Sequence, residues 1–254
     1  MADRPVLALC LGPHRCGTSA VAAAMRAAGA FMALPVDERS DENPKGFFEH
    51  PGLRAMNDAA MAAAGSAWDD PLYQPRGALP EAADSLLAKL AQGPVSAVKD
   101  PRLARMLPLW RPRLSRFDLR AVLVTRTPVE AAMSQRRRCR DNPDFYDFGR
   151  DLAEGAALWL SYTRQMLRDT ADLPALVVSS ADFLARPGDM TAQIAAHLGT
   201  RPDPDKIRGF AASFPDAALH RNRMNTAALA EVEAVFPGLC DAADRLAQTS
   251  GGPP

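Results

Sequence analysis

Residues 6–19 read VLALCLGPHRCGTS and decide the fold. An apolar run over residues 6–11 leads into a loop of the form G-x-x-x-x-G-T-S, after which an alanine-rich stretch begins. This order of patterns predicts a buried strand, a tight loop and a helix. A loop at a helix N-terminus directs backbone N–H groups and the positive end of the helix dipole toward one point. The stretch therefore predicts a binding site for an anion such as a phosphate.

The side chains of this loop narrow the choice of anion. Gly12 permits a tight exit from the strand, and Gly17 lets the backbone approach a ligand without a Cβ in the way. A Walker loop would carry lysine at position 18, where this chain has Thr18. Arg15 supplies a cation two residues before Gly17. These residues suit a nucleotide phosphate but not the β- and γ-phosphates of ATP.

Strand-like and helix-like segments alternate along the chain. Apolar runs at residues 6–11, 95–99, 121–125 and 176–179 are separated by helix-forming stretches. This alternation is typical of a parallel sheet with helices on both faces, which binds ligands at the carboxyl ends of its strands. Arg15, Lys99 and Arg126 all fall at or just beyond such ends.

A second motif, AVLVTRTPVEAAMS at residues 121–134, repeats the strand-to-helix pattern. Residues 121–125 have the composition of a buried parallel strand, and Pro128 suits the first turn of a helix. Arg126 then lies at the strand end, and Ser134, eight residues on, lies inside the helix.

Together the two motifs resemble the sulfotransferases that use 3′-phosphoadenosine 5′-phosphosulfate (PAPS), of the soluble bacterial kind. The resemblance runs from residue 12 to about residue 199. It implies an α/β fold in which a central parallel β-sheet is flanked by helices on both faces, the three-layer sandwich of P-loop nucleotide kinases. It implies that Arg126 and Ser134 bind the 3′-phosphate and that the loop binds the 5′-phosphosulfate. The loop residues to which the resemblance assigns cofactor binding are His14, Arg15, Cys16, Gly17, Thr18 and Ser19.

The acceptor side of the reaction is expected near ENPKGFFEH, residues 42–50. Proline and glycine break helix propensity here, so Glu49 is expected on or after a loop, before a helix that begins near Leu53. Glu49 resembles the glutamate that takes the acceptor's proton in several sulfotransferase branches. His50 is the rival base, since imidazole titrates in a suitable range. Alternatively, Glu49 is a helix-dipole carboxylate without a catalytic part.

The segment SAVKDPRL, residues 96–103, carries the next candidates. Lys99 resembles the lysine that lies beside the sulfuryl group and the leaving oxygen in related enzymes. Its alternative is a side chain that extends along apolar surface to solvent. Asp100 and Pro101 form a natural helix-capping pair, so a structural role is favoured for Asp100. Arg102 faces either the substrate or the surface.

Other segments depart from the family pattern. In residues 176–190, Ser180 and Ala181 occupy the places of a tyrosine and a glutamate, which leaves the adenine contacts open. In the family, a basic, glycine-rich C-terminal loop closes over the 3′-phosphate. The stretch HRNRMN lacks the glycines of that loop, but the resemblance still implies that Arg221 is a 3′-phosphate ligand. The run RRRCR at residues 136–140 is predicted to be a solvated helix face, with the alternative that one member reaches the cofactor or an anionic acceptor.

Composition sets limits on class and location. A chain of 254 residues with 47% hydrophobic content fits one α/β domain, expected over residues 1–248 with a flexible tail at 249–254. Thirty basic and thirty acidic side chains leave no net field to attract nucleic acid or an anionic membrane. Four scattered cysteines have no metal-ligand spacing and suggest reduced thiols in a cytoplasm. Neither a membrane span nor a secretory signal is visible, and no metal is expected.

The predicted activity is sulfuryl transfer from PAPS to a hydroxyl or amine of a small-molecule, carbohydrate or lipid acceptor, by in-line displacement with a carboxylate base and release of 3′-phosphoadenosine 5′-phosphate (PAP). Two alternatives stay open. One is a small-molecule kinase with a degenerate Walker loop; the other is a nucleotide-binding module without catalysis. The sequence does not identify the acceptor or the oligomeric state. Loops at residues 31–48, 66–80 and 140–150 are expected to select the acceptor.

Overall fold

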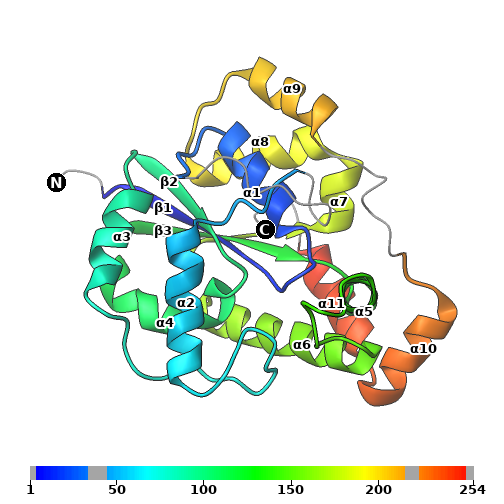
Figure 1. The fold of residues 1–254 in the computed structure, drawn as a ribbon. Helices are drawn as coiled ribbons and strands as arrows, with labels where there is room; N and C mark the ends of the chain where they lie inside the picture. Colours follow the sequence, from blue (N-terminus) through cyan, green and yellow to red (C-terminus); the bar gives the residue numbers. More distant parts are fainter. Residues whose placement is uncertain (1–3, 34–44, 215–222, 250–254) are drawn as a thin grey trace.

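A computed structural model describes residues 4–33, 45–214 and 223–249 (Figure 1). The predicted ligand Arg221, the first part of the segment 42–50 and residues 250–254 of the predicted tail lie outside these ranges. The strands are β1 (Val6–Leu11), β2 (Val95–Lys99), β3 (Asp118–Thr125) and β4 (Ala175–Ser179). The helices are α1 (Thr18–Ala27), α2 (Pro51–Ala63), α3 (Ala82–Leu90), α4 (Leu103–Leu114), α5 (Pro128–Asp141), α6 (Leu152–Asp169), α7 (Ser180–Ala185), α8 (Pro187–Leu198), α9 (Pro204–Ser213), α10 (Thr226–Val235) and α11 (Leu239–Gln248).

The described strands form one parallel sheet in the order β2-β1-β3-β4. The predicted α/β class with a parallel sheet is confirmed. β1 and β2 have the predicted bounds, whereas β3 begins earlier, at Asp118, and β4 at Ala175. Because β1 lies between β2 and β3, the chain crosses over β1 on its way from β2 to β3. The loops that leave β1 and β3 therefore lie side by side, where ligands of such sheets bind.

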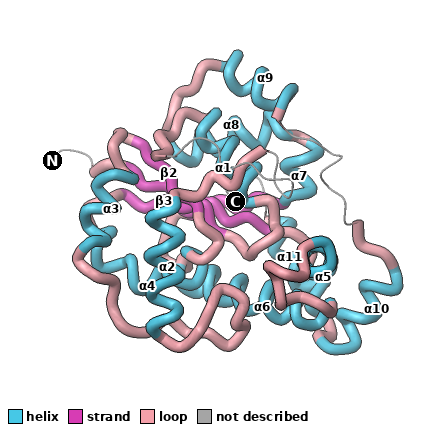
Figure 2. Tube along the Cα trace, in the orientation of Figure 1, coloured by secondary structure: helices cyan, strands magenta, loops and turns pink. Residues whose placement is uncertain are grey.

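Alternate residues of the central strands bury two opposite faces of the sheet. Leu7, Leu9 and Leu11 of β1 pack in one apolar cluster with α2, α3, α4 and α6. Ala8 and Cys10 pack in a second cluster with α1, α7 and α8. Figures 1 and 2 show the sheet between these two sets of helices, which is the predicted three-layer arrangement.

A third apolar cluster joins α5 and α6 to the C-terminal helices α10 and α11. Its members include Cys16 of the loop after β1 and Trp159 of α6. α5 and α6 approach closely at Gly155, where a Cβ would lie 2.7 Å from the Cα of Ala132. This packing fixes the position of α5, the helix that carries Ser134.

Two helix starts bear on the site. α5 begins at Pro128 as predicted, and Thr127 caps it by accepting a hydrogen bond from the backbone N–H of Glu130. α2 begins at Pro51, earlier than the predicted start near Leu53, because His50 serves as its N-cap. None of the described helices combines the length and apolar character that a membrane crossing requires.

Candidate functional site

The loops after β1 and β3 bring the predicted phosphate-binding residues together. The Arg126 guanidinium donates a 3.3 Å hydrogen bond from Nη1 to the carbonyl of Arg15. Arg15 in turn donates from Nε to the Ser134 hydroxyl at 3.0 Å. Arg15 and Ser134 are 119 residues apart in the chain. The structure therefore places Arg15, Arg126 and Ser134 in one connected group.

Backbone geometry shapes the first of these loops. A Cβ at Gly12 would lie 2.6 Å from the carbonyl oxygen of Val124 in β3, so only glycine fits this strand exit. Gly17 is the N-cap of α1 with φ +86°, and as a glycine it supplies no side-chain cap to this helix. Arg15 also has a positive φ, 68°, which is uncommon for a residue with a side chain. The tight loop and the uncapped helix start fit an anion as ligand.

Not every loop side chain faces such a ligand. Cys16 is fully buried in the cluster with Val129 and Trp159, so only its backbone can contact an anion. Burial raises the pKa of its thiol to about 12, against the opposing charge of Arg126, and Cys16 is therefore an inert thiol. In Thr18, by contrast, it is the methyl group that packs toward Gly12, 2.9 Å from the Cβ position of that glycine.

His14 lies among aromatic side chains. Its ring centroid is 4.6 Å from that of Trp68 and 5.3 Å from that of Tyr162. Its Nε2 is buried without a hydrogen-bond partner among the described residues. Burial, followed by the charges of Arg102 and Arg138, lowers the pKa of His14 well below its usual value. A neutral imidazole in the phosphate loop is the result.

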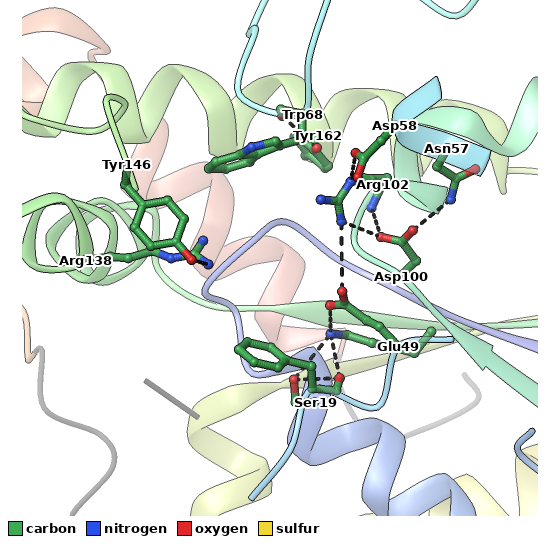
Figure 3. Close-up of polar contacts among 12 residues, drawn as sticks. Ser19, Glu49, Asn57, Asp58, Trp68, Asp100, Arg102, Arg138, Tyr146 and Tyr162 are labelled. Atoms are coloured by element: carbon green, nitrogen blue, oxygen red, sulfur yellow. Dashed lines mark hydrogen bonds and ion pairs between the residues drawn. The ribbon is translucent and has the colours of Figure 1, made fainter. Parts of the chain in front are cut away.

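Lys99 and Glu49 form a direct ion pair beside the start of α1. Lys99 Nζ lies 2.6 Å from Glu49 Oε1 and also donates to the carbonyl of Phe47 at 3.0 Å and to Ser19 Oγ at 3.3 Å. The side chains of Lys99 and Glu49 are 2% and 9% exposed. The alternative in which Lys99 extends to solvent is therefore wrong. Figure 3 shows Glu49 between Ser19 and Arg102.

The environment of Glu49 favours its ionised form. Burial alone would raise its pKa, but the charge and hydrogen bond of Lys99, with Arg102 further away, hold that pKa below its ordinary value. The next residue toward the N-terminus, Phe48, has φ 57°. Arg15 and Phe48 are the only non-glycine residues with positive φ in the described ranges, and both flank this site. Strained backbone of this kind concentrates at functional sites.

Behind Glu49, Asp100 anchors a buried network. Asp100 accepts hydrogen bonds from Asn57 Nδ2 at 2.8 Å, from the backbone N–H of Arg102 at 3.0 Å and from Arg102 Nη1 at 3.1 Å. Arg102 also pairs with Asp58, and its Nη1 lies 4.0 Å from Glu49 Oε2. Asp100 thus has the structural role favoured for it, but it supports the turn before α4 and does not cap the helix, whose N-cap is Arg102. Arg102 faces the site rather than the surface.

This network contains a residue that the sequence did not single out. Asn57, in α2, is fully buried and also accepts a 2.8 Å hydrogen bond from the indole N–H of Trp110. A polar pair, Asn57 and Asp58, within an alanine-rich helix was the available signal. Its partners, Asp100 just after β2 and Trp110 in α4, could not be read from local sequence.

His50, the rival base, has a structural role in α2. Its Nδ1 accepts the backbone N–H of Gly52 at 3.1 Å as the helix cap. Burial, with a smaller effect of Lys89, lowers its pKa. Glu49, in contrast, contacts Lys99 directly, so the geometry favours Glu49 over His50.

The arginine run after Ser134 divides between two environments. Arg136, Arg137 and Arg140 line a surface hollow of about 220 Å³ together with Met133, on the outer face of α5. Arg138 instead turns toward the site: its guanidinium lies 3.7 Å from the ring centroid of Tyr146 and 5.8 Å from that of Trp68. The prediction of a solvated helix face therefore holds for Arg136, Arg137 and Arg140 but not for Arg138. Figure 3 shows Arg138 beside Tyr146, across from Glu49.

Ser180, which occupies the position of the family's tyrosine, lies next to the phosphate loop. It begins α7, and its Cβ lies 3.6 Å from the Cβ position of Gly17.

Possible metal ligands do not cluster in the described structure. Within residues 4–33, 45–214 and 223–249, no three His, Cys, Asp or Glu side chains gather as a metal site would require.

Comparison with known proteins agrees with the fold. No family model matches the chain, and no curated protein matches it in sequence. Among solved structures it is similar to the sulfotransferase domain of the olefin synthase from Synechococcus PCC 7002, with a TM-score of 0.52 and 16% sequence identity. The similarity covers 100% of this chain and 98% of that domain. At this identity the comparison shows a shared fold.

Proposed function

We propose that this protein is a PAPS-dependent sulfotransferase. The observation that carries the proposal is the connected group of Arg15, Arg126 and Ser134, which joins two predicted anion sites where the β1 and β3 loops meet. The fold shared with a sulfotransferase domain supports the same reading. A kinase with a degenerate Walker loop would explain the loop after β1 but gives no reason for Arg126 and Ser134.

The residues present fit the proposed nucleotide. The glycine-lined loop, the uncapped start of α1 and the cations Arg15, Lys99 and Arg126 suit a ligand with phosphate groups at both ends. Backbone N–H groups of residues 15–19 and the hydroxyls of Thr18 and Ser19 would hold the 5′-phosphosulfate. Arg126 and Ser134 would hold the 3′-phosphate. PAPS supplies a sulfuryl group on a leaving group that is already a nucleotide phosphate.

Lys99 and Glu49 divide the chemical work between them. Lys99, assisted by Arg15, stabilises negative charge on the bridging oxygen, because a buried ammonium group needs no reorganisation as that charge grows. Glu49 accepts the proton of the acceptor hydroxyl. The charge and hydrogen bond of Lys99 favour the ionised form of Glu49. When the Lys99 charge is shared with a bound anion, its pull on Glu49 weakens, and Glu49 becomes a better base.

Two measurements, made one after the other, test the proposed function. Calorimetry is expected to show binding of PAP and no comparable binding of ATP with magnesium, whereas a kinase would show the reverse preference. Radiolabelled PAPS is then supplied with a panel of phenols, sugars and long-chain alcohols. We expect transfer by the wild type and a loss of roughly 10²–10³-fold in Lys99→Met, the size seen when one preorganised charge contact is removed.

Controls separate catalysis from folding. Glu49→Gln is expected to bind PAP normally and to lose about 10²–10⁴-fold in transfer, as for a general base. Lys89→Met, which removes an exposed lysine from α3, should behave as wild type. PAP binding without transfer to any acceptor would favour the module without catalysis. Preference for ATP with magnesium would favour the kinase.

A further inference from the structure

Resting on the proposed function, we propose that the Glu130 carboxylate competes with the nucleotide's 3′-phosphate for Arg126 and thereby limits how tightly the nucleotide is held. Glu130 lies in the first turn of α5, between the predicted phosphate ligands Arg126 and Ser134. The reaction itself gives Glu130 no part. Its contact with Arg126 nevertheless places it beside the proposed 3′-phosphate site.

The contacts of Glu130 fix its carboxylate against Arg126. Glu130 Oε2 lies 3.0 Å from Arg126 Nε, and the two side chains are 15% and 11% exposed. The second oxygen, Oε1, accepts the backbone N–H of Met224 at 3.3 Å. With both oxygens engaged, the carboxylate is held in place beside the guanidinium.

A phosphate bound to Arg126 would therefore meet a second anion on the same guanidinium. Two anionic groups that share one cation repel each other, and partial burial strengthens that repulsion because water screens it less. Binding would require Glu130 to give up its Arg126 contact or to remain close to the phosphate. Either route weakens binding at the 3′ end.

This arrangement has a use in turnover. A nucleotide product with phosphates at both ends could otherwise bind so tightly that its release limits the rate. Glu130 offers Arg126 a replacement partner as the product leaves. Adenosine 5′-monophosphate, which has no 3′-phosphate, would not compete with Glu130.

The test compares two nucleotides on two matched variants by calorimetry. Glu130→Gln keeps the size of the side chain and removes its charge. It is expected to bind PAP at least tenfold more tightly than wild type and to leave the affinity for adenosine 5′-monophosphate within twofold. Asp141→Asn removes an equivalent carboxylate from the other end of α5, where Asp141 pairs with Arg137 at 3.1 Å with the same spacing. It should change neither affinity.

The outcomes distinguish this proposal from the function on which it rests. Unchanged or weaker PAP binding by Glu130→Gln, with wild type binding PAP, would mean that Glu130 only orients Arg126 and would overturn the competition. An equal gain for both nucleotides would also overturn it, because the effect would not depend on the 3′-phosphate. Failure of wild type and Glu130→Gln alike to bind PAP would instead refute the proposed function.

Discussion

At the scale of single residues, the site is built from buried charges that have specific partners. Lys99, whose side chain is 2% exposed, is the clearest case, because an unpaired buried ammonium group would be strongly disfavoured. Glu49 compensates its charge, while Ser19 and the Phe47 carbonyl accept its remaining hydrogen bonds. Such a group is already oriented before any ligand arrives. This preorganisation is what electrostatic catalysis requires.

His14 gives a prediction about pH at the same scale. Its pKa in the folded protein is lowered, so the unfolded chain takes up a proton near pH 6.5 that the folded protein refuses. The stability due to neutral His14 is therefore fully present above about pH 6.5 and is lost as the pH falls. We expect wild type to lose up to about 1.4 kcal/mol per pH unit through this residue between pH 6 and 5.

Urea unfolding at pH 7, 6 and 5 measures this contribution. His14→Gln should show a shallower decline than wild type over this range. His50→Asn keeps a capping side chain at the start of α2 and should differ less, since His50 is the less enclosed residue. Equal slopes for wild type and His14→Gln would show that His14 titrates normally in the folded protein.

At the scale of elements, close helix packing positions the proposed 3′-phosphate ligands. A Cβ on Gly155 of α6 would approach both the Cα and the Cβ of Ala132 within 2.8 Å, and backbone atoms cannot yield as a flexible side chain can. Gly155→Ala is therefore expected to destabilise the protein by about 1–3 kcal/mol, although alanine is the better helix former. At Gly209 of α9, no described atom other than those of its chain neighbours and of the helix's own backbone lies within 4 Å of a new Cβ, so Gly209→Ala should stabilise by about 0.5–1 kcal/mol.

Denaturant midpoints of the two variants test the packing argument directly. The two substitutions are expected to change the free energy of unfolding in opposite directions. They share the gain in helix propensity and differ only in the space around the new methyl group. If Gly155→Ala were as stable as Gly209→Ala, α5 and α6 would not be in the tight contact that holds Ser134.

The same scale shows what local sequence predicts well. β1 and β2 have the predicted bounds because Pro5 and Gly12 flank the first apolar run, and Pro94 and Asp100 flank the second. β3 was predicted too short, because Asp118 and Arg120 interrupt the apolar pattern. In the fold these two pair with each other at 3.0 Å, which accommodates their charges at the start of the strand. α4 contains Pro108 and Pro112, yet remains helical while burying Leu107, Leu109 and Trp110.

The residues of the site also divide into those that local sequence identifies and those whose role depends on distant contacts. The loop of residues 14–19, Glu49, Lys99 and Arg126 stand at recognisable breaks between elements. Ser134 lies inside α5 and is identified by its spacing from Arg126. Their pairing was not predicted: Glu49 and Lys99 are 50 residues apart, and no local pattern encodes a contact at that separation. The contact of Asn57 with Asp100 and the turn of Arg138 toward Trp68 depend in the same way on residues far apart in the chain. Glu130, in contrast, pairs with Arg126 at i,i+4 spacing, which is local in sequence.

At the scale of the whole molecule, equal numbers of acidic and basic side chains mean that an anionic ligand is attracted by a local group rather than by the overall field. That group draws on the loop after β1, the loop after β3 and α5, so a bound nucleotide would tie separate parts of the fold together. Ligand that binds only the folded state stabilises it by about 2.7 kcal/mol at a hundredfold excess over Kd. For a chain of this size we expect PAP at that excess to raise Tm by roughly 5–10 °C.

Thermal unfolding with and without PAP measures this shift, each variant being compared with its own ligand-free Tm. Arg126→Ala should lose most of the shift, because the guanidinium that joins Arg15 and Glu130 at the proposed 3′-phosphate site is removed. Arg137→Ala, on the outer face of the same helix, should keep it. An equal shift in both variants would contradict this prediction. It would mean that PAP binds away from the junction of the β1 and β3 loops, because only a ligand held there depends on Arg126.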